Sequence, residues 1–402
     1  MGNTPNIRFK GFTDDWEQRK LPEFVTFFNG LTYTPDDVEE TGTLVLRSSN
    51  VKNGEIVDAD NVYVNDKVVT SENVQEGDII VVVRNGSRAL IGKHAQIKDS
   101  MPNTVIGAFM SGMRSEHSSF VNALLDTSAF ENEIAKNMGA AINQITGYMF
   151  SRMEFMIPSG EEQQKIGEYF QGLDDLITLH QRKCDETKKL KKFMLQKMFP
   201  KKDEKKPEIR FAGFTDDWEQ RKLGDIITEY KETVDSDCTL PILTSSKTEG
   251  VILQEKHFGR KQQHDITGYN ILPRNYCTYR NRSDGVDFTF NINKCCDKGI
   301  ISKFYPVFSG KNSDVFFLSL VLNNSEEVVR EIAYTCTGTG QKVLSFLDLQ
   351  KMKVRVPNFD EQKEIVAYFE SLDHLITLHQ RKCDEIKEIK KFMLQNMFPQ
   401  KG

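Results

Sequence analysis

The chain has 402 residues, of which 38% are hydrophobic, 28% charged and 10% aromatic, as is typical of a globular protein with two or three domains. A net charge of −5 shows no overall basic excess, so any DNA-binding surface must be local. The longest strongly apolar run, Ile79–Val83, is far shorter than the roughly 20 residues of a membrane span. The first residues lack the apolar core of a secretory signal, and seven irregularly spaced cysteines suggest reduced thiols. We therefore expect a cytoplasmic protein.

Two pairs of nearly identical segments divide the chain into halves. Residues 7–21 read IRFKGFTDDWEQRKL, and residues 209–223 differ from them at one of 15 positions. Residues 176–200 read LITLHQRKCDETKKLKKFMLQKMFP, and residues 375–399 differ from them at four of 25 positions. The stretches between look unrelated, which indicates a duplicated scaffold that carries two separately chosen binding surfaces. The alternative is a duplication in which the middle stretches simply drifted.

The repeats predict five successive parts of the chain. These are a globular domain at 1–158, a long helix at 159–200, a charged linker at 201–208, a second domain at 209–357 and a second long helix at 358–402. Each helix is expected to start after a proline, with acidic residues in its first turn, where the helix dipole favours negative charge.

Apolar or neutral residues recur at steps of three and four along both predicted helices, which favours an antiparallel coiled-coil pair. The alternative is that each helix braces its own domain. His180 and His379 lie on this stripe, and we interpret them as packed or paired histidines rather than metal ligands or catalytic groups. The predicted pairing residues are Ile177, His180, Cys184, Leu190 and Met194 in the first helix, and Ile376, His379, Cys383, Ile386 and Met393 in the second.

The two middle stretches share a frame at an offset of 196 residues. Ile79–Val83 followed by Arg84 and Asn85 then falls on residues 275–279 followed by Arg280 and Asn281, and each reads as a strand that leads into a polar loop. Arg and Asn suit bidentate contacts with guanine and adenine edges. The candidate DNA-binding residues are Arg47, Ser48, Ser49, Asn50, Arg84, Asn85, Ser87 and Arg88 in the first half, and Thr244, Ser245, Ser246, Lys247, Arg280, Asn281, Arg282, Ser283, Gln341 and Lys342 in the second.

No catalytic or metal-binding motif stands out in the sequence. It contains neither the Pro-Pro pair of an adenine methyltransferase motif, nor a Walker A sequence, nor a G-x-S-x-G nucleophile elbow. Cys277, Cys295 and Cys296 lack the paired spacing of a zinc site. The sequence favours a non-catalytic reader and scaffold without a cofactor or metal of its own. Two alternatives remain open: a nuclease with an unrecognised active site, and a protein adaptor with no DNA role.

The layout resembles the specificity subunit of type I restriction-modification systems. The resemblance rests on the duplication, on the P-x2-3-[ED]-E-Q-x2-I pattern at Pro158–Ile166 and Pro357–Ile365, and on Leu344-Ser345-x2-Asp348-Leu349. The first-half counterpart of this last motif, Ile145-Thr146-x2-Met149-Phe150, departs from the pattern.

The resemblance implies an α+β chain with an internal pseudo-twofold duplication, in which two α/β target recognition domains are separated by two long conserved helices. Each domain would read one half of a split site in double-stranded DNA. The resemblance also implies two modification subunits, which methylate adenine N6 from S-adenosylmethionine, and up to two restriction subunits, which use ATP and magnesium to translocate and cleave DNA.

Overall fold

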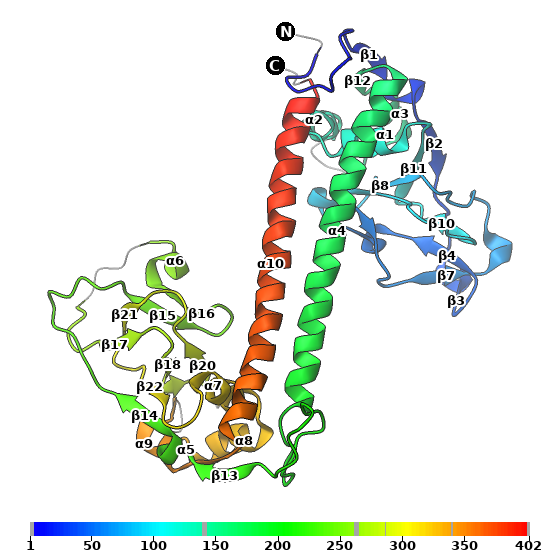
Figure 1. Cartoon of the computed structure of the whole chain (residues 1–402). Helices are drawn as coiled ribbons and strands as arrows, with labels where there is room; N and C mark the ends of the chain where they lie inside the picture. Colours follow the sequence, from blue (N-terminus) through cyan, green and yellow to red (C-terminus); the bar gives the residue numbers. More distant parts are fainter. Residues whose placement is uncertain (1–3, 139–142, 261–264, 286, 339–340, 400–402) are drawn as a thin grey trace. The chain divides into compact units, whose positions relative to one another are not determined.

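The protein is described by a computed structural model for residues 4–138, 143–260, 265–285, 287–338 and 341–399 (Figure 1). It divides into two compact units. Unit 1 comprises Met1–Arg182 and His379–Gly402, and unit 2 comprises Lys183–Leu378. The division crosses both long helices, α4 (Gly160–Lys197) and α10 (Phe359–Met397), so each unit contains one globular domain and half of each helix. Within the described residues, no helix is both long and apolar enough to cross a membrane.

The central sheet of unit 1 is antiparallel and has four strands in the order β2-β11-β8-β9. Their bounds are Thr26–Asn29 for β2, Met110–Arg114 for β11, Ile79–Val82 for β8 and His94–Gln96 for β9. All four residues of β8 are buried, because the sheet packs against helices α1 (Ser118–Leu125) and α2 (Ser128–Asn137) in one hydrophobic core. The apolar run noted in the sequence is therefore a core strand.

Unit 2 repeats this sheet in the order β14-β22-β18-β20. Its strands are Ile227–Tyr230 for β14, Val307–Gly310 for β22, Cys277–Tyr279 for β18 and Phe290–Ile292 for β20. Val82 lies opposite Met110 in unit 1, and Thr278 lies opposite Val307 in unit 2. β8 and β18 both stand third in the strand order of their sheets, and Arg84 and Arg280 follow them at the 196-residue offset found in the sequence.

The remaining elements complete the two domains. In unit 1 they are β1 (Glu17–Lys20) paired with β12 (Glu154–Ile157), the sheet β10 (Thr104–Ile106), β4 (Thr43–Leu46), β7 (Val62–Val64) and β3 (Val38–Glu39), the pair β5 (Val51–Lys52) and β6 (Glu55–Ile56), and helix α3 (Gly147–Ser151). In unit 2 they are β13 (Glu219–Lys222) paired with β24 (Lys353–Val356), β15 (Leu243–Ser246) with β16 (Gly250–Leu253), β17 (Asn270–Pro273) with β21 (Lys298–Ile301), β19 (Arg282–Ser283) with β23 (Lys342–Val343), and helices α5 (Leu223–Ile226), α6 (Gln254–Phe258), α7 (Val315–Asn324), α8 (Glu326–Thr335) and α9 (Phe346–Lys351).

The nearly identical segments have matching structural roles in the two units. In unit 1, Arg8 forms a bidentate ion pair with the fully buried Glu162 at the start of α4, with N–O distances of 2.7 and 2.8 Å. In unit 2, Arg210 contacts Glu361 at the start of α10 in the same way, with both distances 2.6 Å. The repeated arginine and the repeated Glu-Gln pair therefore fix the chain preceding each domain to the beginning of a long helix.

The other end of each long helix is anchored by aromatic packing. Phe398, just after α10, lies in the core of unit 1, with its ring centroid 5.9 Å from that of Trp16 and 5.7 Å from that of Phe120. Phe199, just after α4, packs in unit 2 against Trp218 at 6.1 Å and Phe317 at 6.2 Å. Each unit is thus built on the start of one long helix and the end of the other.

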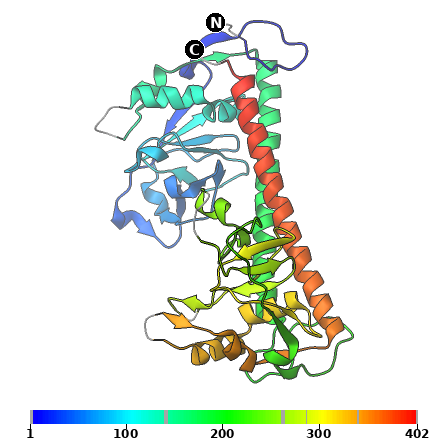
Figure 2. The ribbon, with the colours of Figure 1, turned by 90° about the vertical axis from the view of Figure 1, so that its left-hand side faces the viewer.

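The halves of α4 and α10 lie side by side within each unit and run antiparallel (Figures 1 and 2). In unit 1, the Nδ1 atoms of His180 and His379 are 3.0 Å apart, and the Cys383 thiol lies 3.9 Å from the Ile177 carbonyl oxygen. In unit 2, the Cys184 thiol lies 3.8 Å from the carbonyl oxygen of Ile376. Mixed helix and sheet, two repeated domains and two long helices confirm the predicted fold class.

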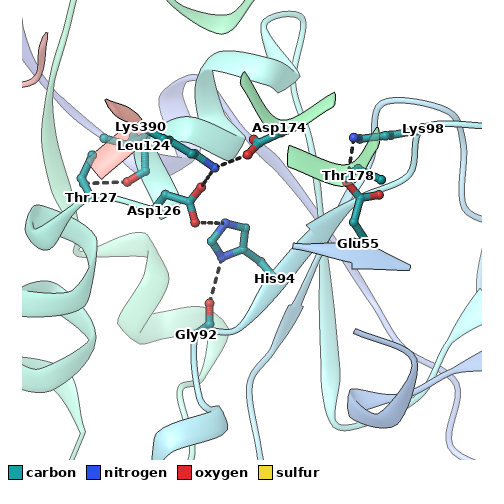
Figure 3. A network of polar contacts seen from close by, with 10 residues as sticks. All are labelled: Glu55, Gly92, His94, Lys98, Leu124, Asp126, Thr127, Asp174, Thr178 and Lys390. Atoms are coloured by element: carbon teal, nitrogen blue, oxygen red, sulfur yellow. Dashed lines mark hydrogen bonds and ion pairs between the residues drawn. The ribbon is translucent and has the colours of Figure 1, made fainter. Parts of the chain in front are cut away.

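A network of charged groups attaches the domain of unit 1 to both helices (Figure 3). Lys390 of α10 contacts Asp126, just after α1, at 2.6 Å and Asp174 of α4 at 2.5 Å. His94 of β9 extends the network, with Nε2 3.4 Å from Asp126 and Nδ1 3.1 Å from the carbonyl oxygen of Gly92. Because the lysine and the histidine are mostly buried, the carboxylates compensate for charge that has been removed from water.

Candidate nucleic-acid interface

The Arg-Asn loop of unit 1 directly follows the core strand β8. The backbone amides of Val83 and Arg84 both donate to the carbonyl oxygen of Phe109, at 3.0 and 3.2 Å. The Arg84 guanidinium lies 5.1 Å from the centroid of the Phe109 ring, and Phe109 is itself 56% exposed. The sheet therefore fixes the loop backbone while leaving the arginine side chain at the surface.

Three segments of unit 1 that are distant in the sequence meet at this loop. The Asn85 amide donates to the Ser48 hydroxyl at 3.1 Å, which joins the loop to residues 47–50. Asn143 donates from its side chain to the Gly86 carbonyl oxygen at 3.0 Å, and Gln144 forms a β-bridge with Arg84. We call residues 47–50, 84–88 and 143–144 cluster 1.

Unit 2 contains a corresponding loop after β18. The backbone N–H of Asn281 donates to the carbonyl oxygen of Phe304 at 2.8 Å, and the Arg282 guanidinium lies 4.4 Å from the centroid of the Phe304 ring. The β19–β23 pairing then places Ser283 opposite Lys342. In both units a loop backbone is thus hydrogen-bonded to a phenylalanine carbonyl, and an arginine of that loop lies over the phenylalanine ring.

Residues 244–247 are connected to the loop of unit 2 through Asp287, and to the neighbouring strand β18 through Asn291 of β20. Asn291 donates to the Ser245 hydroxyl at 2.8 Å and to the Ser246 carbonyl oxygen at 2.9 Å. Lys247 contacts the Asp287 carboxylate at 2.5 Å, and the Ser283 hydroxyl donates to the Asp287 carbonyl oxygen at 3.2 Å. We call residues 244–247, 280–283 and 341–342 cluster 2.

Most of the predicted DNA-binding residues reach the surface. The exposed ones are Ser49, Arg84, Ser87, Arg88, Lys247, Arg280, Arg282 and Gln341. The partly exposed ones are Arg47, Ser48, Asn85, Thr244, Ser245, Ser246, Asn281, Ser283 and Lys342. A protein surface of arginine, lysine, amide and hydroxyl groups can form hydrogen bonds with both phosphates and base edges.

Asn50 differs from the other predicted DNA-binding residues in being buried. Its residue has no exposed surface, and its side-chain amide donates to the Ala59 carbonyl oxygen at 2.8 Å and to the Asn61 side chain at 2.9 Å. Its side-chain oxygen accepts the backbone N–H of Arg47 at 2.9 Å. Because these bonds occupy the amide inside the domain, the Asn50 side chain shapes the loop and is not exposed on its surface. The Arg47 guanidinium forms an ion pair with Asp60 at 2.7 Å, so Arg47 is less available than Arg84 for a contact with a ligand.

The predicted helix-pairing residues differ in their burial. Cys184 and Cys383 are fully buried, whereas Ile177, His180, Met194, Ile376, His379, Ile386 and Met393 are partly buried. Leu190 is 45% exposed, so its side chain contributes less to pairing than the sequence suggested.

Sequence reasoning missed the two phenylalanines, Phe109 and Phe304, and the closing residues Asn143 and Gln144. A single exposed phenylalanine carries no distinctive signal, and its place under an arginine depends on strand pairing. Among the described residues, no group of three or more His, Cys, Asp or Glu side chains is placed to hold a metal ion. Burial raises the pKa of the Cys277 thiol well above its ordinary range, so this thiol is a core group.

Comparisons with known proteins agree on one family. A family model described as type I restriction modification DNA specificity domain matches residues 13–189 and 215–388. The chain is similar to a putative type I restriction enzyme MjaX specificity subunit of Methanocaldococcus jannaschii, with 25% identity over 413 aligned positions that cover 94% of this chain and 91% of the relative. It is also similar to the EcoKI specificity subunit of Escherichia coli strain K12, with 26% identity over 165 residues, or 39% of this chain and 35% of the relative.

A solved structure shares the fold. The S subunit of a type I restriction-modification system from M. genitalium matches with a TM-score of 0.64 and 13% sequence identity, over 99% of this chain and 100% of that one.

Proposed function

This chain belongs to the family of type I restriction modification DNA specificity proteins, and we propose that clusters 1 and 2 each read one half of a split DNA target. DNA sequence recognition by two target recognition domains is the role of this family. The observation that carries the assignment to the clusters is their recurrence. The two domains have dissimilar middle sequences, yet each presents a polar loop after the third strand of its own four-stranded sheet.

The geometry of each loop suits base reading. A side chain that discriminates between bases needs a fixed backbone, because bidentate contacts tolerate little displacement. The Phe109 carbonyl oxygen accepts two hydrogen bonds from the loop of unit 1, and Phe304 accepts one in unit 2. Arg84 and Arg280 then extend from anchored backbone as exposed cations, which favours them as the principal reading residues.

The sequence-derived ranges serve as our proposal for the functional domains. Residues 1–158 and 209–357 form the two target recognition domains, 159–200 the central conserved helix, 201–208 the linker and 358–402 the distal conserved helix. The helices act as a ruler that sets the spacing between the half-sites.

The chain is a non-catalytic subunit that works within a larger assembly in the cytoplasm. Two modification subunits bind it and supply adenine-N6 methylation from S-adenosylmethionine. Up to two restriction subunits supply ATP- and magnesium-dependent translocation and cleavage. Support for this assembly comes from family membership and from the duplicated scaffold, which offers two similar surfaces to two copies of one partner.

The test is the methylation motif produced by the assembled modification complex. Arg84→Ala is expected to relax one base position in one half-site, and Arg280→Ala one in the other, each at a cost of roughly 1–3 kcal/mol in discrimination. Arg19→Ala and Arg221→Ala are matched controls, because these exposed arginines lie on β1 and β13, which do not belong to the cluster of their own unit. The proposal is wrong if both cluster variants keep the wild-type motif and affinity.

A further inference from the structure

A tight turn in unit 1 carries an exposed phenylalanine beside cluster 1. Residues 107–110 connect β10 to β11, and the backbone N–H of Met110 donates to the Gly107 carbonyl oxygen at 2.8 Å, which closes the turn. Phe109 is the third residue of this turn and is 56% exposed, and the preceding Ala108 is exposed as well. The tip of the turn therefore presents apolar surface to solvent.

This turn lies next to two segments of cluster 1. The Phe109 carbonyl oxygen accepts two hydrogen bonds from the loop after β8, and the Phe109 ring lies 5.1 Å from the Arg84 guanidinium. The Gly107 N–H donates to the Leu46 carbonyl oxygen at 2.9 Å, and a Cβ atom at Gly107 would lie 3.7 Å from Cγ of Arg47. The apolar tip is thus placed among groups that can form hydrogen bonds with DNA.

Unit 2 has the same turn with a different surface. The backbone N–H of Tyr305 donates to the Ser302 carbonyl oxygen at 2.9 Å between β21 and β22, so Phe304 is again the third residue of a turn. The exposed residue before it is a lysine, Lys303, where unit 1 has an alanine. The cations of Lys303 and Arg282 lie 5.8 and 4.4 Å from the centroid of the Phe304 ring, which is only partly exposed. Charged side chains therefore shield in unit 2 the ring that unit 1 exposes.

We propose that Phe109, together with the methyl group of Ala108, contacts the C5-methyl group of a thymine in the half-site read by cluster 1. This methyl group is the apolar feature of the base edges in the major groove, and Phe and Ala side chains suit contact with it. Arg84 and Asn85 suit guanine and adenine edges in the same groove, so one groove can accommodate the turn and the loop together. This role of Phe109 rests on the proposed function of cluster 1 and makes Phe109 a specificity-determining residue.

The spacing between the ring and the guanidinium locates the thymine. Stacked base pairs are about 3.4 Å apart, and the Phe109 ring centroid lies 5.1 Å from the Arg84 guanidinium. The thymine is therefore expected in the base pair that Arg84 reads or within about two base pairs of it. We expect no such thymine preference from cluster 2, because two cations lie over the Phe304 ring.

The test measures methylation by the assembled modification complex. Its motif is first determined in plasmid DNA, and duplexes with this motif are then made with deoxyuridine in place of one thymidine at a time. Uracil lacks only the C5-methyl group, so base pairing and the hydrogen-bonding edges stay the same. At the thymine near the Arg84 position, uracil is expected to lower the methylation rate at limiting DNA by about three- to tenfold, the loss that one buried methyl contact carries.

Three variants separate the methyl contact from other effects. Phe109→Ala should methylate the thymine duplex as slowly as the uracil duplex, whereas Phe109→Leu should keep most of the difference because leucine retains an apolar contact. Phe304→Ala is the matched control, since it removes the equivalent ring of unit 2 and should leave the thymine-to-uracil ratio of the first half-site unchanged. Thermal melts establish that each variant is folded.

Arg84→Ala distinguishes failure of the cluster from failure of this contact. An unchanged motif in Arg84→Ala would refute the reading role of cluster 1 and the thymine contact with it. A motif relaxed by Arg84→Ala, but with no response to uracil nearby or no thymine within about two base pairs, would overturn the role of Phe109 alone. So would a Phe109→Ala variant that relaxes the Arg84 position and still responds to uracil, because Phe109 would then only support the arginine.

Discussion

The charged network in unit 1 predicts that one histidine makes the stability of this unit depend on pH. The Gly92 carbonyl oxygen can only accept a hydrogen bond, so Nδ1 of His94 must carry a proton, while Nε2 faces Asp126. Burial is the largest influence and lowers the pKa of His94, but the hydrogen bond and negative charge of Asp126, with the Gly92 carbonyl, outweigh it and raise the pKa overall. The structure therefore favours the imidazolium form.

The sign of the pH effect follows from this shift. A histidine whose pKa is higher in the folded state adds stability below its unfolded pKa of about 6.5, and this stability is lost as pH rises through the folded pKa. Asp126 stays ionised over this range, because His94 and Lys390 overcome the effect of burial and hold its pKa far below the ordinary value. The wild-type unit should thus lose the His94 contribution as the pH rises above about 6.5.

The perturbation is Asp126→Asn, which removes the carboxylate from both cations. Removing one partner of a fully buried ion pair costs about 3–5 kcal/mol. Here the Asp126 side chain is 31% exposed and Lys390 keeps Asp174, so we expect a loss of roughly 2 kcal/mol in the free energy of unfolding. For a unit of this size, that loss corresponds to a Tm decrease of about 4–8 °C.

The assay is thermal unfolding of wild type and variant at about pH 6 and about pH 8. The difference in Tm between wild type and Asp126→Asn should be larger at the lower pH, because the variant leaves an imidazolium buried without its carboxylate. Asp174→Asn is the control: Asp174 contacts Lys390 but not His94, so this variant should keep the His94 contribution to stability at low pH. An equal gap between wild type and Asp126→Asn at both pH values would refute the reasoning.

Three further predictions concern the scaffold and the role of the chain. Arg8→Met should destabilise unit 1 by about 3–5 kcal/mol because Glu162 is left buried and unpaired, and adding Glu162→Leu should restore most of this loss in urea unfolding. A variant with four residues inserted after Gln181 and four after Thr377, at matching levels of the helix pair, should lengthen the unspecified spacer of the methylated motif by about one or two base pairs. The reason is that one helical turn adds about 6 Å. An active variant that keeps the original spacing would contradict the role of the helices as a ruler. The isolated chain should show no saturable binding of S-adenosylmethionine in calorimetry, with the assembled complex as positive control.

The sequence predicted those features that depend on local periodicity. Steps of three and four residues specify a helix and its apolar face, so α4 and α10 and the facing of His180 and His379 could be read directly. A strand followed by a polar loop is likewise a local pattern, and β8 and β18 end where the two Arg-Asn loops begin.

Features that depend on contacts between distant segments could not be predicted. Asn50 looked like any loop asparagine, and only the fold around it shows that its amide is buried. Leu190 fits the stripe but lies where the partner helix leaves it exposed. The segment boundaries and the DNA-reading residues stay predictions, because base contacts depend on the shape of the bound DNA as well as on loop geometry.

The aromatic anchor of α10 has a consequence for how the protein is made. Phe398 fills the space beside Trp16 and Phe120, so the core of unit 1 is completed by a residue that is synthesised after the second domain. At roughly 5–20 residues per second, about 10–40 s of synthesis separate Pro200 from Phe398. During that interval the nascent first domain presents an unfilled aromatic surface of the kind that chaperones bind. A chain whose translation stops before Phe398 never closes this surface, so the completed first domain exists only in molecules that also carry the second domain.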